Sequence, residues 1–300
     1  MSILIYADML DAARELKSAA TALSSSECVK AFFPTEALSN EAAAYMDSYY
    51  AGSLPVQDAH AVASAIAQVA EQFECDKVLL RSDRIGKDLA GHLAQIMKTD
   101  ALTGVFELTS DGVASRSALG GALIEESVLT GGTKIFAVSP KSYSLCGEGA
   151  GNSSEIRVDI PAPAVTVKAV EPRKGGHDDV AAADVVIAVG CGFDEQGDMT
   201  AVEELAGKLK GAVGCTKPIA TDRKWFPEDC IIGISGKTCR PSLAISIGIS
   251  GQVQYWAGIR DAGTAIAINS DKNAAIVSLC DASVIMDGPK AVAELNAKLG

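Results

Sequence analysis

The sequence has 300 residues and a formal net charge of −12 at pH 7. Nucleic acid phosphates and anionic membrane surfaces repel so acidic a chain, so neither is an expected partner. Hydrophobic residues make up 48% of the chain and charged residues 21%, which excludes general disorder. A chain of this length suits two domains of roughly 100 to 200 residues each.

Strand-like and helix-like stretches alternate along the first half. Residues 2–6 are an apolar strand, and residues 9–23 and 61–73 have the apolar spacing of helices. A second buried strand is expected at 77–80, followed by a helix that runs to Met97. Such alternation predicts a parallel sheet with helices on both faces.

A proline- and glycine-rich stretch, IPAPAVTVKAVEPRKGGHD, occupies residues 160–178. It has no helical period and is typical of a junction between domains. We therefore predict an N-terminal α/β domain at 1–165, a linker at 166–179 and a C-terminal domain at 180–300. Movement of the two domains about this linker is expected.

The second half repeats the alternation of strands and helices. It opens on the continuous apolar run DVVIAV, which is typical of a buried parallel strand. The fold class is therefore α/β, with two doubly wound parallel-sheet domains of which the second is Rossmann-like. The expected strands of the second domain are residues 184–189, 231–232, 243–247, 264–268 and 283–286, and its helices are 200–210 and 289–299.

The reactive residue types form no familiar catalytic or metal-binding pattern. Eight cysteines are present, none in a CxxC pair, and the three histidines lie far apart in the sequence. A metal site and a Ser-His-Asp hydrolase are therefore not supported. We assign no catalytic residue and no metal ligand.

A glycine turn follows the first strand of the second domain. Gly190-Cys191-Gly192 would let backbone amides approach a phosphate, but the next glycine is Gly197, so the dinucleotide fingerprint GxGxxG is not met. A tight turn without a ligand explains this feature equally well. An NAD-dependent oxidoreductase built on the turn is disfavoured further, because no substrate acid or base is evident.

Two serine turns flanked by glycines, GISG, occur at residues 233–236 and 248–251. The second follows a strand and is expected to open a helix, where free amides and the Ser250 hydroxyl would face an anion. That arrangement fits a pyrophosphate. A plain loop in which Ser250 caps the helix is the alternative, and the turn alone does not decide between them.

The stretch ISIGISGQVQYWAG, followed by TAIAINSDKNAAI, resembles the C-terminal signature of electron-transferring flavoprotein alpha subunits. An upstream block, Gly211 to Pro218, and the IGKDLA of residues 85–90 are also similar to that family. The resemblance covers essentially the whole chain and is strongest from Asp184 onward. It implies FAD held mainly by the C-terminal domain, and a beta subunit that contacts the N-terminal domain and completes a heterodimer.

The resemblance also implies a function without substrate chemistry of its own. Such a carrier shuttles electrons between an acyl-CoA-type dehydrogenase or enoyl-CoA-type reductase and a quinone reductase or another acceptor. No stretch reaches about 18 uninterrupted apolar residues, and the first residues form a strand rather than a leader. We expect a cytoplasmic protein without membrane insertion.

Carried over by motif position, the family's cofactor-binding residues fall on fifteen positions of this chain. Thr216 and Lys217 would lie near the flavin, and Ser235 near its N5 edge. A hydroxyl and a cation there would stabilise the negative charge that accumulates on reduction. The implied set is Cys191, Thr216, Lys217, Gly233, Ile234, Ser235, Ser250, Gly251, Gln252, Val253, Gln254, Tyr255, Asn269, Asp287 and Gly288, with residues 250–255 around the pyrophosphate and ribityl chain and the last three at the adenosine end.

Three of these positions depart from the family pattern. Cys191 and Lys217 each stand where the family has arginine, and Tyr255 stands where many members have histidine. We expect weaker FAD binding and less stabilisation of negative charge on the flavin, since lysine lacks the planar fork and a phenol is neutral. A paralogue that has lost FAD and acts as a scaffold subunit is the alternative.

Overall fold

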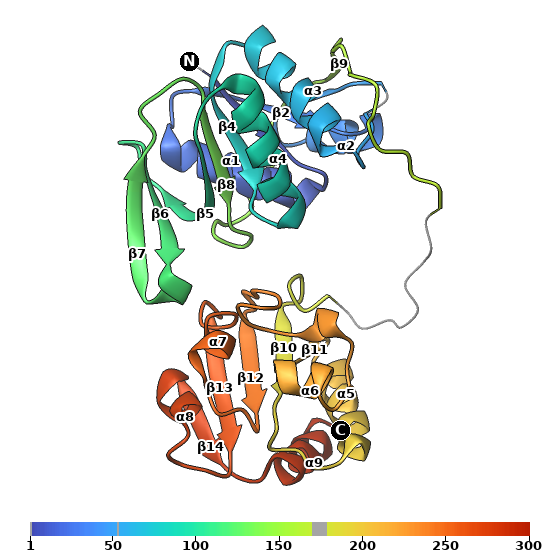
Figure 1. Ribbon diagram of the computed structural model, residues 1–300, viewed down its shortest axis with the longest axis vertical. Coiled ribbons are helices and arrows are strands. Elements are labelled where there is room, and N and C mark those ends of the chain that lie inside the picture. The colour runs from blue at the N-terminus through green and yellow to red at the C-terminus, as the bar shows by residue number, and fades with distance from the viewer. Residues whose placement is uncertain (1, 53, 170–178) are drawn as a thin grey trace. The chain divides into compact units, whose positions relative to one another are not determined.

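The computed structural model describes residues 2–52, 54–169 and 179–300 (Figure 1). The chain divides into two compact units, Met1–Val170 and Glu171–Gly300. Most of the linker predicted at 166–179 lies in 170–178, outside the described residues. Before it, the Ala164 amide donates to Asp58 Oδ2 over 2.7 Å, so this part of the proline-rich stretch is attached to the first unit.

The first unit contains one sheet and four α-helices among its described residues. Its elements are β1 (Ser2–Tyr6), α1 (Leu10–Leu23), β2 (Cys28–Phe33), α2 (Glu36–Ala42), β3 (Asp47–Tyr50), α3 (Ala59–Gln72), β4 (Cys75–Arg81), α4 (Arg84–Met97), β5 (Ala101–Leu108), β6 (Val113–Ala118), η1 (Leu119–Gly121), β7 (Leu123–Val128), β8 (Lys134–Val138) and β9 (Ser153–Glu155).

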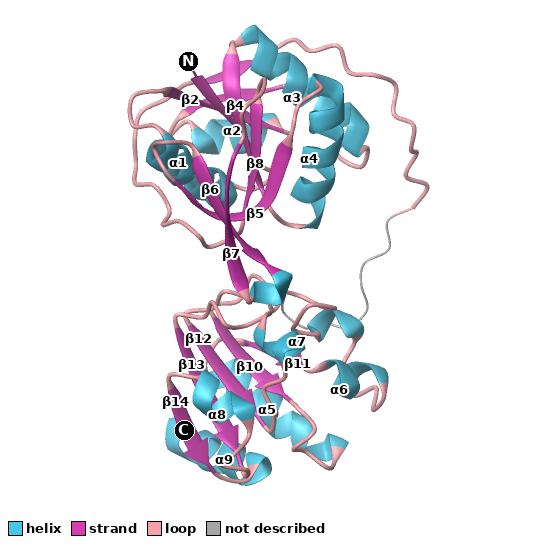
Figure 2. Cartoon of the chain, turned by 60° about the vertical axis from the view of Figure 1, so that its left-hand side comes forward, coloured by secondary structure: helices cyan, strands magenta, loops and turns pink. Residues whose placement is uncertain are grey.

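Alternate side chains of β1 enter two different cores. Ile3 and Ile5 belong to a cluster that includes Leu16 of α1, whereas Leu4 belongs to a cluster with Leu89 of α4. In Figure 2, α1 and α4 flank the strands on opposite sides. Each fully buried aliphatic side chain contributes about 1.5–3 kcal/mol, so both faces of the sheet stabilise the unit.

The strand order of this sheet is β7-β6-β5-β8-β4-β1-β2-β3-β9. The seven neighbouring strands β5-β8-β4-β1-β2-β3-β9 are parallel, as predicted. At the other end of the sheet, β6 pairs antiparallel with both β5 and β7. This antiparallel arm was not predicted. The sequence feature that could have indicated a hairpin here is the Asp111-Gly112 pair at the β5–β6 turn, where Gly112 has φ +80°.

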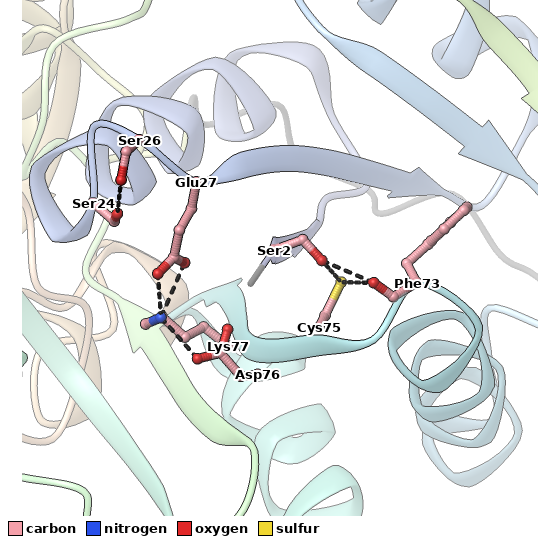
Figure 3. A network of polar contacts seen from close by, with 8 residues as sticks. All are labelled: Ser2, Ser24, Ser26, Glu27, Phe73, Cys75, Asp76 and Lys77. Carbon is pink, nitrogen blue, oxygen red and sulfur yellow. Dashed lines mark hydrogen bonds and ion pairs between the residues drawn. The ribbon is translucent and has the colours of Figure 1, made fainter.

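A polar network joins the amino ends of the central strands (Figure 3). Lys77 Nζ donates to both oxygens of Glu27, at 2.8 and 2.9 Å, and to Asp76 Oδ2 at 2.9 Å. Burial opposes the charge on Lys77, but the hydrogen bonds to Glu27 and Asp76 outweigh it and raise the pKa of the ammonium group. Ser2 Oγ donates to the Phe73 carbonyl nearby, at 2.9 Å.

The second unit forms a separate parallel sheet. Its elements are β10 (Val185–Val189), η2 (Gln196–Asp198), α5 (Met199–Lys208), β11 (Ala212–Cys215), α6 (Lys217–Thr221), η3 (Glu228–Cys230), β12 (Leu243–Ile247), α7 (Val253–Trp256), β13 (Thr264–Asn269), α8 (Ala275–Leu279), β14 (Ala282–Ile285) and α9 (Gly288–Leu299).

The order of this sheet, β11-β10-β12-β13-β14, is that of a doubly wound fold. The chain crosses to opposite sides after β10 and β12, so the sheet has its topological switch point between their carboxyl ends. The strand predicted at 231–232 forms only isolated bridges to Cys215 and Lys237. No helix within the described residues is long and apolar enough to cross a membrane.

Candidate functional site

Two glycine turns meet at the switch point of the second sheet. The Gly190 amide donates to the Ile247 carbonyl over 3.0 Å, and the Gly192 amide to the Gly248 carbonyl over 2.9 Å. A β-carbon on Gly190 would lie 2.5 Å from the Gly248 oxygen, and one on Gly192 would lie 2.6 Å from the Gly248 Cα. Only glycine permits this approach, so the two backbones form one rigid edge.

The first of the two GISG turns, at residues 233–236, lies against α7. The Ile234 amide donates to the Gln254 carbonyl over 2.9 Å. Gly233 has φ +134°, and a β-carbon there would collide with the Gln254 oxygen. The predicted helix after Gly251 is only the single turn Val253–Trp256, and its N-cap residue is Gln252 rather than Ser250. Ser250 therefore does not cap this helix.

A cavity of about 790 Å³ opens between these turns, within the second unit. Its volume is typical of a site for a large organic ligand. The residues that line it are Gly190, Cys191, Gly192, Thr216, Lys217, Pro218, Thr221, Asp222, Ile232, Gly233, Ser235, Gly248, Ile249, Ser250, Gln252, Gln254, Tyr255, Asn269, Asp271 and Ala274.

Most of the predicted cofactor-binding residues line this cavity. They come from the carboxyl ends of β10, β11, β12 and β13, from the segments that follow these strands, and from the turn at 233–236, which only the folded chain brings together. The predicted residues in the lining are Cys191, Thr216, Lys217, Gly233, Ser235, Ser250, Gln252, Gln254, Tyr255 and Asn269.

Five predicted residues lie outside the lining. Ile234 and Val253 are 60% and 65% exposed. Gly251 has φ +87° and backs onto Ile276. Asp287 caps α9, where it accepts from the Lys290 amide over 3.2 Å, and Gly288 packs near Ile247 and Phe193.

Thr221 and Asp222 line the cavity but were not predicted. They lie at the carboxyl end of α6 and just beyond it, next to Thr216 and Lys217 in space and sequence. The stretch that resembles the family in this region, residues 211–218, ends before Thr221 and therefore did not indicate either residue. Their side chains bond each other, Thr221 Oγ1 to Asp222 Oδ1 at 2.8 Å.

One buried polar atom of the cavity has no hydrogen-bond partner among the described residues. The Thr216 Oγ1 atom is buried and makes no hydrogen bond, although Thr216 occupies the N-cap position of α6. A buried hydroxyl without a partner costs free energy. Because Thr216 lines the cavity, a rotation of its side chain toward the cavity would let a polar ligand satisfy this hydroxyl.

The charges on the lining are mixed. Within the described lining, Lys217 is the one cation, and Asp222 and Asp271 are the anions. Lys217 lies at the start of α6 and is exposed. It is placed to attract a negative charge into the cavity.

Asn269 connects two walls of the cavity. Its Nδ2 donates to the Ile249 carbonyl over 2.8 Å, and its Oδ1 accepts from the Asp271 amide over 2.9 Å. The side chain therefore fixes the end of β13 to the turn that carries Ser250. This brace supports the cavity whether or not Asn269 also touches a ligand.

Comparison with known proteins identifies the family. Residues 6–164 match the family described as "Electron transfer flavoprotein domain", and residues 179–260 match "Electron transfer flavoprotein FAD-binding domain". The "Electron transfer flavoprotein subunit alpha" of Mycobacterium leprae is 32% identical over 240 residues, covering 78% of this chain and 74% of that protein.

Two further relatives are named Protein FixB. The protein of Salmonella typhimurium strain LT2 is 30% identical over 244 residues, and that of Escherichia coli O157:H7 is 29% identical over 244 residues. Each alignment covers 79% of this chain and 78% of the relative. The family matches extend over both units, including the turns that form the cavity. The chain belongs to the electron transfer flavoprotein family and is similar to its alpha subunits.

Proposed function

We propose that this chain is the FAD-binding alpha subunit of a heterodimeric electron carrier. The observation that carries the proposal is the cavity at the switch point of the second sheet, whose walls are glycine turns and whose lining includes a buried, unpartnered hydroxyl. Parallel sheets bind nucleotide-like cofactors at this place. A family match to a FAD-binding domain at 179–260 supports FAD as the ligand.

The residues of the lining have chemistry suited to each part of FAD. The backbones around Gly192 and Gly248 allow close approach of the pyrophosphate, and the Ser250 hydroxyl is available to it. Lys217 and Thr216 would lie beside the flavin ring, and Asn269 and Asp271 at the adenosine end. A bound flavin supplies the redox chemistry, and the protein positions it and excludes water.

The partners are proposed from the same family. A beta subunit completes the heterodimer, a dehydrogenase or enoyl-CoA-type reductase exchanges electrons with the carrier, and a quinone reductase is one acceptor. The proposal assigns no catalytic acid or base to this chain, since a carrier needs only to hold the flavin within electron-transfer distance of its partners.

The first experiment is an absorption spectrum of the chain co-expressed with its beta subunit, before and after stepwise reduction. We expect flavin absorption equal to one FAD per heterodimer, which disappears on reduction. Two FADs would place a second flavin on the partner subunit. A colourless complex would contradict the proposal and favour a scaffold subunit.

Thr216→Val separates cofactor binding from folding. Valine keeps the shape but removes the unpartnered hydroxyl, so the free chain should be as stable as the wild type or more stable, by up to about 1 kcal/mol. FAD binding should weaken about tenfold, because the cofactor loses a hydrogen-bond partner. Fluorescence titration with FAD and thermal unfolding without it measure the two effects.

Thr216→Ser is the matched control, because it retains the hydroxyl. It should bind FAD nearly as well as the wild type. Equal affinity of the valine and serine variants would show that the hydroxyl at position 216 does not contact the cofactor.

A further inference from the structure

Two buried hydroxyl groups meet beneath the cavity. The Tyr255 hydroxyl and the Ser246 Oγ are 2.7 Å apart. Tyr255 is 5% exposed and Ser246 is 1% exposed, so the pair is shielded from water. Burial raises the pKa of Tyr255, which keeps the phenol neutral. Each hydroxyl satisfies the other at a position where an unpaired one would be costly.

The sheet leaves space for an aromatic ring around Ser246. In the strand register, Ser246 of β12 pairs with Ala188 of β10 and with Ala267 of β13. Both alanines belong to the same buried cluster as Tyr255, whereas Ile245 and Ile247 belong to the cluster on the opposite face. Three small side chains therefore form a row across three neighbouring strands, on the face where Tyr255 packs.

Tyr255 connects this row to two walls of the cavity. It lies in α7, where its amide donates to the Gln252 carbonyl over 3.0 Å. The carbonyl of Gln254, the residue before Tyr255, accepts from the Ile234 amide, and Gly233 lies against Gln254 and the Tyr255 Cα. Gln252, Gln254 and Gly233 all line the cavity. A tilt of the Tyr255 ring would therefore displace both the α7 turn and the Gly233 turn.

We propose that Ser246 is a positioning residue for the cofactor cavity. It holds the Tyr255 ring on the sheet, which fixes the α7 turn and the Gly233 turn in the binding geometry. It also bonds the phenol hydroxyl of Tyr255 inside the protein. This inference rests on the proposed function, in which the ligand of the cavity is FAD.

Ser246→Ala tests the proposal. The substitution leaves the Tyr255 hydroxyl buried without its partner, so the heterodimer should bind FAD about tenfold more weakly than the wild type. The visible circular dichroism of the bound flavin should also change, because the walls around it move. Thermal unfolding of the cofactor-free protein, measured alongside, shows how much of the effect is general loss of stability.

Two rescue variants distinguish positioning from a general structural effect. Ser246→Thr keeps the hydroxyl and should restore both affinity and the dichroism spectrum. Ser246→Ala combined with Tyr255→Phe removes both hydroxyls and should bind FAD more tightly than Ser246→Ala alone. Ser242→Ala is the control, since its hydroxyl bonds the Asp184 carbonyl at the other end of β12, outside the cavity.

The results separate this inference from the proposed function. If the wild type binds one FAD and Ser246→Ala binds it equally well with the same spectrum, only the inference is overturned. Failure of both rescue variants would also overturn it, because the loss would then not come from the hydroxyl pair. A wild-type heterodimer that takes up no FAD contradicts the proposed function itself, and this inference with it.

Discussion

Gly248→Ala should abolish FAD binding at micromolar cofactor. Gly248 has φ +63°, and a β-carbon there would lie 2.8 Å from the Gly192 Cα and 3.1 Å from its nitrogen. Both neighbours are backbone atoms of the opposing turn, so a rotamer change cannot relieve the collision. The turns must move apart, and we expect at least about 3 kcal/mol of lost binding free energy, a factor of about 150.

Gly197→Ala is the matched control for this variant. Gly197 lies in η2 of the same unit, its φ is not positive, and a β-carbon there would meet nothing within 4 Å. It should bind FAD as the wild type does. The dissociation constants come from fluorescence titration. Full affinity in Gly248→Ala would show that the cofactor does not bind at the switch point.

The sequence predicted the strands of the second sheet because parallel strands are buried on both faces. Asp184 and Ser246 are the only polar residues in the runs at 184–189 and 243–247, and both runs became strands inside the sheet, β10 and β12. The strand predicted at 231–232 was wrong, because these two residues form isolated bridges and not a continuous strand pairing. The antiparallel arm of β5 to β7 was not predicted because β5 and β6 are mostly half-buried and β7, LIEESV, is mostly exposed, so none of the three shows a clear apolar period.

The residues that line the cavity could be predicted from the sequence only where they belong to a recognisable motif. The turns at 190–192 and 248–251 carry local glycine signals, and the family resemblance added Thr216, Ser235 and Asn269. Asp222 carries no such signal, because its place in the lining depends on how α6 packs after β11. Ser246 is a single polar residue within the apolar strand LAISI, and its role emerges only from the contact with Tyr255.

Lys77→Met should destabilise the first unit without weakening FAD binding. The ammonium group bridges Glu27 and Asp76 at the amino ends of the strands, and its side chain is only 11% exposed. Removing it leaves the carboxylates of Glu27 and Asp76, 15% and 33% exposed, without this cation, and Asp76 Oδ1 has no hydrogen-bond partner among the described residues. We expect the free energy of unfolding to fall by about 3 kcal/mol at neutral pH. Denaturant titration measures this change.

The pH dependence of this loss has a defined sign. The pKa of Lys77 is raised above 10.5 in the folded protein, so its contribution is fully present below the pKa of an unfolded lysine. It disappears as the pH rises through the folded value. The difference in stability between wild type and Lys77→Met should therefore be constant from pH 7 to 10 and shrink above about pH 10.5.

Glu27→Gln combined with Lys77→Met should cost less stability than Lys77→Met alone, because the double variant leaves one fewer uncompensated charge. Lys87→Met, at an exposed position on α4, is the control and should change stability little. If the two lysine variants were equally stable, the network in Figure 3 would contribute nothing to folding. If Lys77→Met instead weakened FAD binding and left the stability unchanged, the prediction would be wrong, because the Lys77 network would then affect the cofactor cavity and not the stability of the first unit.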